Sequence, residues 1–155
     1  MKKGGSFWER ELYQSPAFLA LHKNAIIMLF ALMDARKRES PSQAKDKKGT
    51  RRKPEFINLD RLEMPYKTLQ KVYGMNQPGT VRAIDKLLAN GFIKISHCGG
   101  LRPHDKTRYV LINDYLKWEP GTVFRKRVHD VHMGYQGPPK VYEQEPLKKN
   151  KRYET

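Results

Sequence analysis

Residues 66–112 constrain the fold more than any other part of the chain. Their first half predicts two short helices around a tight turn at Gly74, and their second half predicts two β-strands at residues 92–98 and 107–112. Gly74 suits the left-handed conformation that ends a helix, and Asn76 can cap the helix that follows. We expect this helix, turn, helix and hairpin to form the centre around which the other segments are arranged.

The second of these helices, at residues 77–90, has one apolar face. Apolar residues recur in it at steps of three and four, which predicts a core-facing stripe of Val81, Ile84, Leu87 and Leu88. Pro78 fits the first turn of the helix, where a missing N–H group leaves no hydrogen bond unmade. The side away from the core is expected to carry Gln77, Gly79, Arg82, Asp85, Lys86 and Ala89.

The chain before residue 36 predicts further helical segments. Residues 1–14 have near-helical apolar spacing and are expected to pack on the body as a short N-terminal segment. Ser15 and Pro16 are typical of an N-cap followed by proline at the first helical position. From Phe18 onward, apolar steps of three and four indicate a strongly buried helix, interrupted near Leu21 and ending in the cations at residues 36–38.

A basic insertion follows at residues 39–55. Residues 36–54 carry nine Lys or Arg residues against two acidic residues, with almost no apolar side chain to bury. Such a segment cannot pack a core, and we expect it to be flexible without a partner. It is either a solvated linker or a basic arm that lies on phosphates without choosing a sequence. Residues 56–59 have the composition of a short strand, which we expect to be the third strand of the sheet.

The chain changes character after residue 118. Tyr115, Leu116 and Trp118 are expected to cover the open end of the core. Residues 119–155 form a basic extension with several Pro and Gly residues, in which apolar residues such as Phe124 are expected to dock part of the segment. Its end is expected to be disordered. The prediction is therefore one domain at residues 15–118 with an N-terminal segment and a C-terminal extension.

The charge balance favours a polyanionic partner. The 155 residues include 31 Lys and Arg against 16 Asp and Glu, a net charge of +15, and nucleic acid is the commonest partner of such proteins. The single cysteine, Cys98, excludes an intrachain disulfide and a multi-cysteine zinc site. No apolar run reaches the roughly 20 residues of a membrane span and no signal peptide is recognisable, so we expect a cytoplasmic protein without membrane attachment.

Residues 69–74, 80–88 and 90–95 resemble the helix-turn-helix and first wing strand of bacterial winged-helix proteins. That family includes transcription regulators and the DNA-binding domains of phage and plasmid replication proteins, and residues 15–25 resemble the first helix of such proteins. The resemblance covers residues 15–118, with the basic segment as an insertion. It implies an α+β, mainly α, fold: a winged helix-turn-helix with a three-stranded antiparallel wing sheet and basic extensions. Pro78 and Gly79 depart from the Ser, Thr or Arg often found there, which leaves fewer side chains to read bases.

The resemblance also implies duplex DNA binding, by a transcription regulator or a replication-associated factor. The second helix would enter the major groove and present Asn76, Gln77, Gly79, Arg82 and Lys86, with Gly79 letting the backbone approach the DNA. Phosphate contacts are expected from the first helix and the wing, through Lys67, Thr68, Lys71, Arg102, His104, Lys106 and Arg108. The basic arms would add Lys47, Lys48, Arg51, Arg52, Lys53, Arg125, Lys126 and Arg127.

Other functions remain open at this point. The winged helix can be a scaffold for protein interaction, with a second copy or another protein bound through the C-terminal extension. Aromatic residues near basic ones also admit single-strand or RNA binding. His129, Asp130 and His132 have metal-ligand character but lack a further ligand pair, so we expect no metal, no cofactor and no enzymatic activity.

Overall fold

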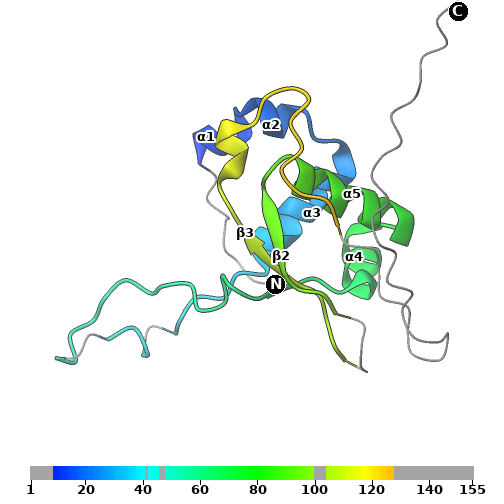
Figure 1. The fold of residues 1–155 in the computed structure, drawn as a ribbon. Helices are drawn as coiled ribbons and strands as arrows, with labels where there is room; N and C mark the ends of the chain where they lie inside the picture. The colour runs from blue at the N-terminus through cyan, green and yellow to red at the C-terminus, as the bar shows by residue number, and fades with distance from the viewer. Residues whose placement is uncertain (1–8, 41, 46–47, 100–103, 128–155) are drawn as a thin grey trace, which may run out of the picture.

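Helices α3 and α5 pack against each other at the centre of the molecule (Figure 1). The computed structural model describes residues 9–40, 42–45, 48–99 and 104–127. Its helices are α1 (Arg10–Tyr13), α2 (Pro16–Leu19), α3 (Lys23–Asp34), α4 (Tyr66–Tyr73), α5 (Gln77–Ala89) and the 3-10 helix η1 (Asp114–Lys117). Its strands are β1 (Leu62–Glu63), β2 (Ile93–His97) and β3 (Arg108–Leu111). The described chain is thus α+β and mainly helical.

The break predicted near Leu21 separates α2 from α3. Ser15 caps α2 as predicted, because its hydroxyl oxygen accepts the N–H of Phe18 at 3.1 Å. His22 caps α3 in the same way, with its Nδ1 accepting the N–H of Ala25 at 3.3 Å. Helix α3 then buries its apolar stripe, which consists of Ala25, Met28, Leu29, Ala31 and Leu32.

The turn between α4 and α5 has the predicted chemistry. Gly74 ends α4 in the left-handed region, with a φ of 66°, which a glycine adopts without steric cost. Asn76 caps α5, since its side-chain oxygen accepts the N–H of Gly79 at 2.8 Å. Pro78 lies in the first turn of α5. The helix, turn and helix predicted from the sequence are confirmed.

The core-facing side of α5 differs in part from the predicted stripe. Three of the four predicted residues are buried, but Val81 is only half-buried. The buried face begins instead with Gly79 and Thr80. Helix α3 passes so close at this point that a Cβ atom on Gly79 would lie 2.7 Å from the side-chain nitrogen of Asn24. Gly79 is therefore buried at a position where the spacing alone predicted an exposed surface.

The three strands form one antiparallel sheet in the order β1-β3-β2. The hairpin of β2 and β3 is confirmed, and Ile93 pairs with Leu111 at its open end, where Ile93 is buried in the core. Ile93 is buried and Lys94 exposed, which is the alternation expected of a half-buried strand. The hairpin projects away from the helices (Figure 1).

The prediction of the third strand at residues 56–59 is wrong. The strand is β1, a few residues later, where Leu62 pairs with Tyr109 and is fully buried. Phe56 is held elsewhere, in an isolated bridge with Arg38, and Ile57 is 49% exposed. Leu62 and Glu63 lack the β-branched and aromatic composition of residues 56–59, and the strand forms there because its pairing with β3 buries Leu62 in the core.

The C-terminal part of the described chain closes the core. Tyr115 stacks on Phe92 with ring centroids 4.7 Å apart, and Trp118 is half-buried, whereas Leu116 is 54% exposed and does not cover the core as predicted. The chain then crosses the end of α5, where the N–H of Phe124 donates to the carbonyl oxygen of Ala89 at 2.9 Å. This docking of the segment around Phe124 was expected. The disorder predicted for the C-terminal end of the chain concerns residues that lie outside the described part.

The basic insertion, residues 39–55, extends as an arm away from the helical body (Figure 1). A bridge between Arg38 and Phe56 closes its base, and a second bridge joins Lys45 to Arg51 farther out. Ala44 is 1% exposed even though it lies in this polar segment. The arm is therefore built like an irregular hairpin. Its flexibility without a partner stays a prediction.

Candidate nucleic-acid interface

The exposed side of α5 carries three of the five residues predicted for base contact. Gln77 and Arg82 are exposed and Lys86 is half-buried. The Arg82 side chain lies along the helix, where its Nε donates to the carbonyl oxygen of Pro78 at 3.3 Å. A guanidinium held parallel to the helix still presents its remaining N–H groups to a ligand. Helix α5 thus offers the amide of Gln77 at its start and two neighbouring cations, Arg82 and Lys86, one turn apart.

The other two predicted residues of α5 have structural roles. Gly79 is buried against Asn24 of α3, so the prediction that its backbone is open to a close approach by DNA is wrong. The apolar pattern of α5 did not include Gly79, because a glycine has no apolar side chain that would mark it as a core residue. Asn76 is exposed, but its side-chain oxygen is occupied by the cap, which leaves only the amide nitrogen for an outside contact.

Helix α4 presents a broad exposed surface. Lys67, Thr68 and Lys71 are all exposed, as expected of residues that contact a partner. Val72 is 65% exposed, and Leu69 alone is buried in this helix. Helix α4 packs against both α3 and α5.

The wing cations surround one carboxylate. Lys106 Nζ lies 3.4 Å and Arg108 Nε lies 3.6 Å from the carboxylate oxygens of Glu63 on β1. His104 is exposed and has a φ of 66°. Arg102, also predicted for the wing, lies outside the described residues. Glu63 offsets part of the wing's positive charge, which the sequence did not indicate because the pairing joins two distant segments.

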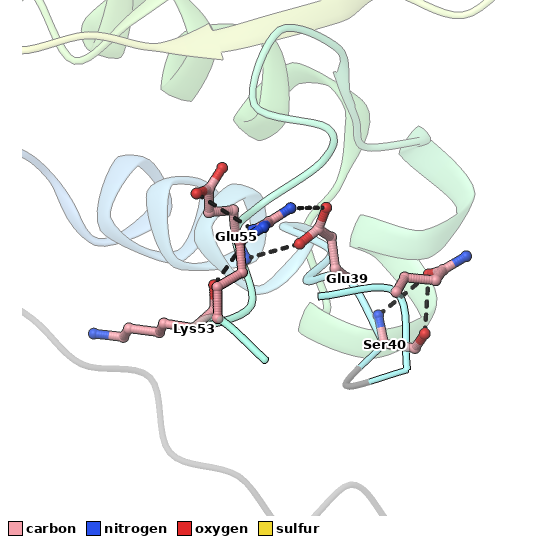
Figure 2. A network of polar contacts seen from close by, with 6 residues as sticks. Glu39, Ser40, Lys53 and Glu55 are labelled. Atoms are coloured by element: carbon pink, nitrogen blue, oxygen red, sulfur yellow. Dashed lines mark hydrogen bonds and ion pairs between the residues drawn. The ribbon is translucent and has the colours of Figure 1, made fainter. Parts of the chain in front are cut away.

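The basic arm divides its cations between structure and surface. Arg52 donates to Glu39 at 2.8 Å and lies 3.3 Å from Glu55, so it holds the two sides of the arm together (Figure 2). The hydrogen bond from Arg52 lowers the pKa of the Glu39 carboxyl group below its ordinary value, and the same contact raises the pKa of Arg52. The remaining predicted cations of the arm that are described, which are Lys48, Arg51 and Lys53, are exposed. Lys47 lies outside the described residues.

Two arginines flank the aromatic ring at the base of the arm. The guanidinium carbons of Arg36 and Arg38 lie 4.7 Å and 4.8 Å from the centroid of the Phe56 ring. Burial, reinforced by the charge of Arg38, lowers the pKa of Arg36. These cation–π contacts stabilise the base of the arm. The sequence did not indicate these contacts, because no local pattern links Phe56 to the two arginines.

The basic residues of the C-terminal extension are partly neutralised by the body. Arg125 lies 2.6 Å from the Asp114 carboxylate, and the Nε of Arg127 lies 3.0 Å from a carboxylate oxygen of Asp85 on α5. Lys126, between them, is exposed. The structure therefore brings Arg127 onto the helix predicted to read bases, next to its acidic residue.

No family model, curated protein or solved structure matches this chain. Its candidate interface therefore depends on sequence pattern and geometry. No group of three or more His, Cys, Asp or Glu residues that could hold a metal ion occurs among the described residues, and His129, Asp130 and His132 lie outside them. In the same part of the chain, no helix is long and apolar enough to cross a membrane.

Proposed function

We propose that the protein is a winged helix-turn-helix protein that binds duplex DNA, as a transcription regulator or a replication-associated factor. The observation that carries the proposal is the order of elements. Helices α3, α4 and α5, with β1 between the first two and the β2–β3 hairpin after the last, follow the winged-helix order, and the sheet order is β1-β3-β2. Fold alone does not decide function, so the proposal also needs the chemistry of the exposed surfaces.

Helix α5 is the proposed reading helix. Its start is exposed at Gln77 and Arg82, and residues near the start of a recognition helix are those that reach base edges in helix-turn-helix complexes. Glutamine can pair bidentately with adenine and arginine with guanine. Asp85 lies on the same helix and would repel phosphates, but Arg127 neutralises it at 3.0 Å. This pairing keeps the helix compatible with a polyanion.

Affinity is proposed to come mainly from the surrounding cations. Lys67 and Lys71 on α4, Lys106 on the wing and the exposed cations of the arm would contact phosphates, while the base-reading helix contributes few side chains. The net charge of +15 adds a long-range attraction for any nucleic acid. Binding should therefore be strong at low salt, with sequence preference carried by α5 alone.

The test is selection of duplexes from a random pool by the full chain at two salt concentrations, followed by affinity measurements across salt. We expect one enriched motif, and an affinity that falls with a log-log slope of about −0.9 for each phosphate contacted. The variant Arg10→Ala/Lys117→Ala should bind like the wild-type chain, because both residues are exposed on α1 and η1, away from the proposed interface. Affinity that does not change with salt would contradict the proposal, and preference for single strands or capture of protein alone would favour the alternatives.

A further inference from the structure

A hollow lies where the base of the arm meets the sheet and the start of α4. It has a volume of about 360 Å³ and opens to solvent. Its polar lining consists of Lys37, Asn58, Arg61, Glu63 and Lys106, beside Pro65. These residues come from four separate segments: the chain that follows α3, the return of the arm, β1 and the wing. Only the tertiary structure brings them together.

The charge of the lining is positive. Three cations face a single carboxylate, and that carboxylate, Glu63, is already shared by Lys106 at 3.4 Å and Arg108 at 3.6 Å. Within the described part of the chain, neither Lys37 nor Arg61 takes part in an ion pair, and both are exposed. Like charges gathered around an open hollow attract an anion more strongly than isolated surface cations do.

Hydrogen bonds hold the walls of the hollow in place. The side-chain oxygen of Asn58 accepts the N–H of Lys37 at 2.7 Å, and its amide nitrogen donates to the carbonyl oxygen of Ala35 at 2.9 Å. The N–H of Ile57 donates to the carbonyl oxygen of Lys37 at 2.9 Å, and that of Arg61 to Asn58 at 3.1 Å. Lys37 and Arg61 thus start from a fixed backbone, so a bound anion orders only their side chains.

Helix α4 begins at the rim of the hollow and adds to its field. Pro65, which lines the hollow, is the N-cap residue of this eight-residue helix and makes no side-chain capping bond. A helix N-terminus carries a partial positive charge of about half an electron charge, which favours a nearby anion. The positive end of the helix and the three cations therefore both favour a bound anion.

We propose that this hollow binds a phosphate group of the DNA backbone. The inference rests on the proposed DNA binding and adds Lys37 and Arg61, which were not among the predicted contacts. Phosphate fits the lining because it accepts several charge-assisted hydrogen bonds at once, from guanidinium, ammonium and amide groups. The DNA backbone is favoured over a free phosphate compound because the hollow is open and lies between the wing, α4 and the arm.

The test compares the double variant Lys37→Ala/Arg61→Ala with the wild-type chain and with Arg10→Ala/Lys117→Ala, which removes the same charge elsewhere. Affinity for one duplex is measured across salt, with thermal unfolding as the check on folding. We expect the hollow variant to bind about tenfold more weakly and its log-log salt slope to be shallower by about one, beyond the change in the control. The charge-retaining variant Lys37→Arg/Arg61→Lys should recover most of the affinity.

A second arm of the experiment separates the sources of phosphate. Wild type and hollow variant are titrated with inorganic phosphate and with a nucleoside monophosphate, followed by amide shifts of residues 57–61. If the hollow variant matches the control on duplex DNA, the inference is overturned while DNA binding stands. Loss of nucleotide binding with unchanged DNA binding also overturns it, in favour of a free ligand. If the wild-type chain does not bind duplex DNA at all, both the inference and the proposed function are overturned.

Discussion

The helical body and the basic arm are both rich in cations but are held together by different forces. In the body, α3 and α5 pack together and bury leucine and methionine side chains completely. The exposed cations lie on the surface of this apolar core. In the arm, the charged side chains hold the segment together. Arg52 pairs with Glu39 and Glu55, and Arg36 and Arg38 contact the ring of Phe56. Mutating an exposed cation such as Lys67 in the body or Arg51 in the arm should therefore change binding alone, whereas mutating Arg52 should also change the shape of the arm.

The largest expected effect separates the two regions by stability. Leu87→Ala removes a fully buried side chain from α5 and should lower the free energy of unfolding by about 2–5 kcal/mol, because the core collapses only partly around the cavity. Phe56→Ala, at the base of the arm, should lower it by only about 1–2 kcal/mol, because it removes two cation–π contacts of about 0.5–1 kcal/mol each. Denaturant titration measures both. Equal effects would mean that the arm is part of the cooperative core.

The next effect separates the regions by what they recognise. Gln77→Ala with Arg82→Ala should reduce discrimination between the selected duplex and a scrambled one by about 1–3 kcal/mol for each bidentate base pairing that the variant can no longer make. Arg51→Ala with Lys53→Ala, in the arm, should weaken binding to both duplexes alike and flatten the salt slope by about 0.9 for each phosphate that is no longer neutralised. Fluorescence anisotropy on both duplexes gives the comparison. The reverse pattern would show that α5 is not the reading helix.

The smallest expected effect is the pH dependence of the Arg52–Glu39 contact, which is confined to the arm. Because Arg52 lowers the pKa of Glu39 in the folded arm, the contact contributes stability above the ordinary value of 4.5 and loses it as the pH falls through the lower folded pKa. Carboxyl NMR titration should show Glu39 with a midpoint below 4.5, while the α3–α5 core stays folded. Arg52→Ala should return the midpoint toward the ordinary value, and Arg51→Ala should leave it low. A normal midpoint in the wild-type chain would mean that the contact does not form in solution.

Predictable features of the fold were those with a local cause. The Ser15 cap, the left-handed Gly74 and the Asn76 cap follow from short-range geometry, and the structure has all three. The hairpin followed from alternation, which the two faces of a strand impose on any half-buried sheet. At the candidate site, the same periodicity identified Gln77 and Arg82 as exposed.

The errors share a nonlocal cause. Gly79 was predicted to be exposed and is buried, since Asn24 of α3 fills the space beside it. The third strand was expected at residues 56–59, but Phe56 is held by two arginines that precede the arm. In both cases the deciding neighbour lies far away in the sequence, where no periodicity reports it.

The sequence by itself determined the helices, the turn, the hairpin and the excess of positive charge, because each depends on a residue and its near neighbours. The tertiary structure decided which cations meet. It placed Arg127 on Asp85 of α5, set Glu63 among the wing cations, and brought Lys37 and Arg61 to the rim of one hollow. The physical reason is that charges act across space, so the field that a partner meets depends on how the chain is folded and not on the order of its residues.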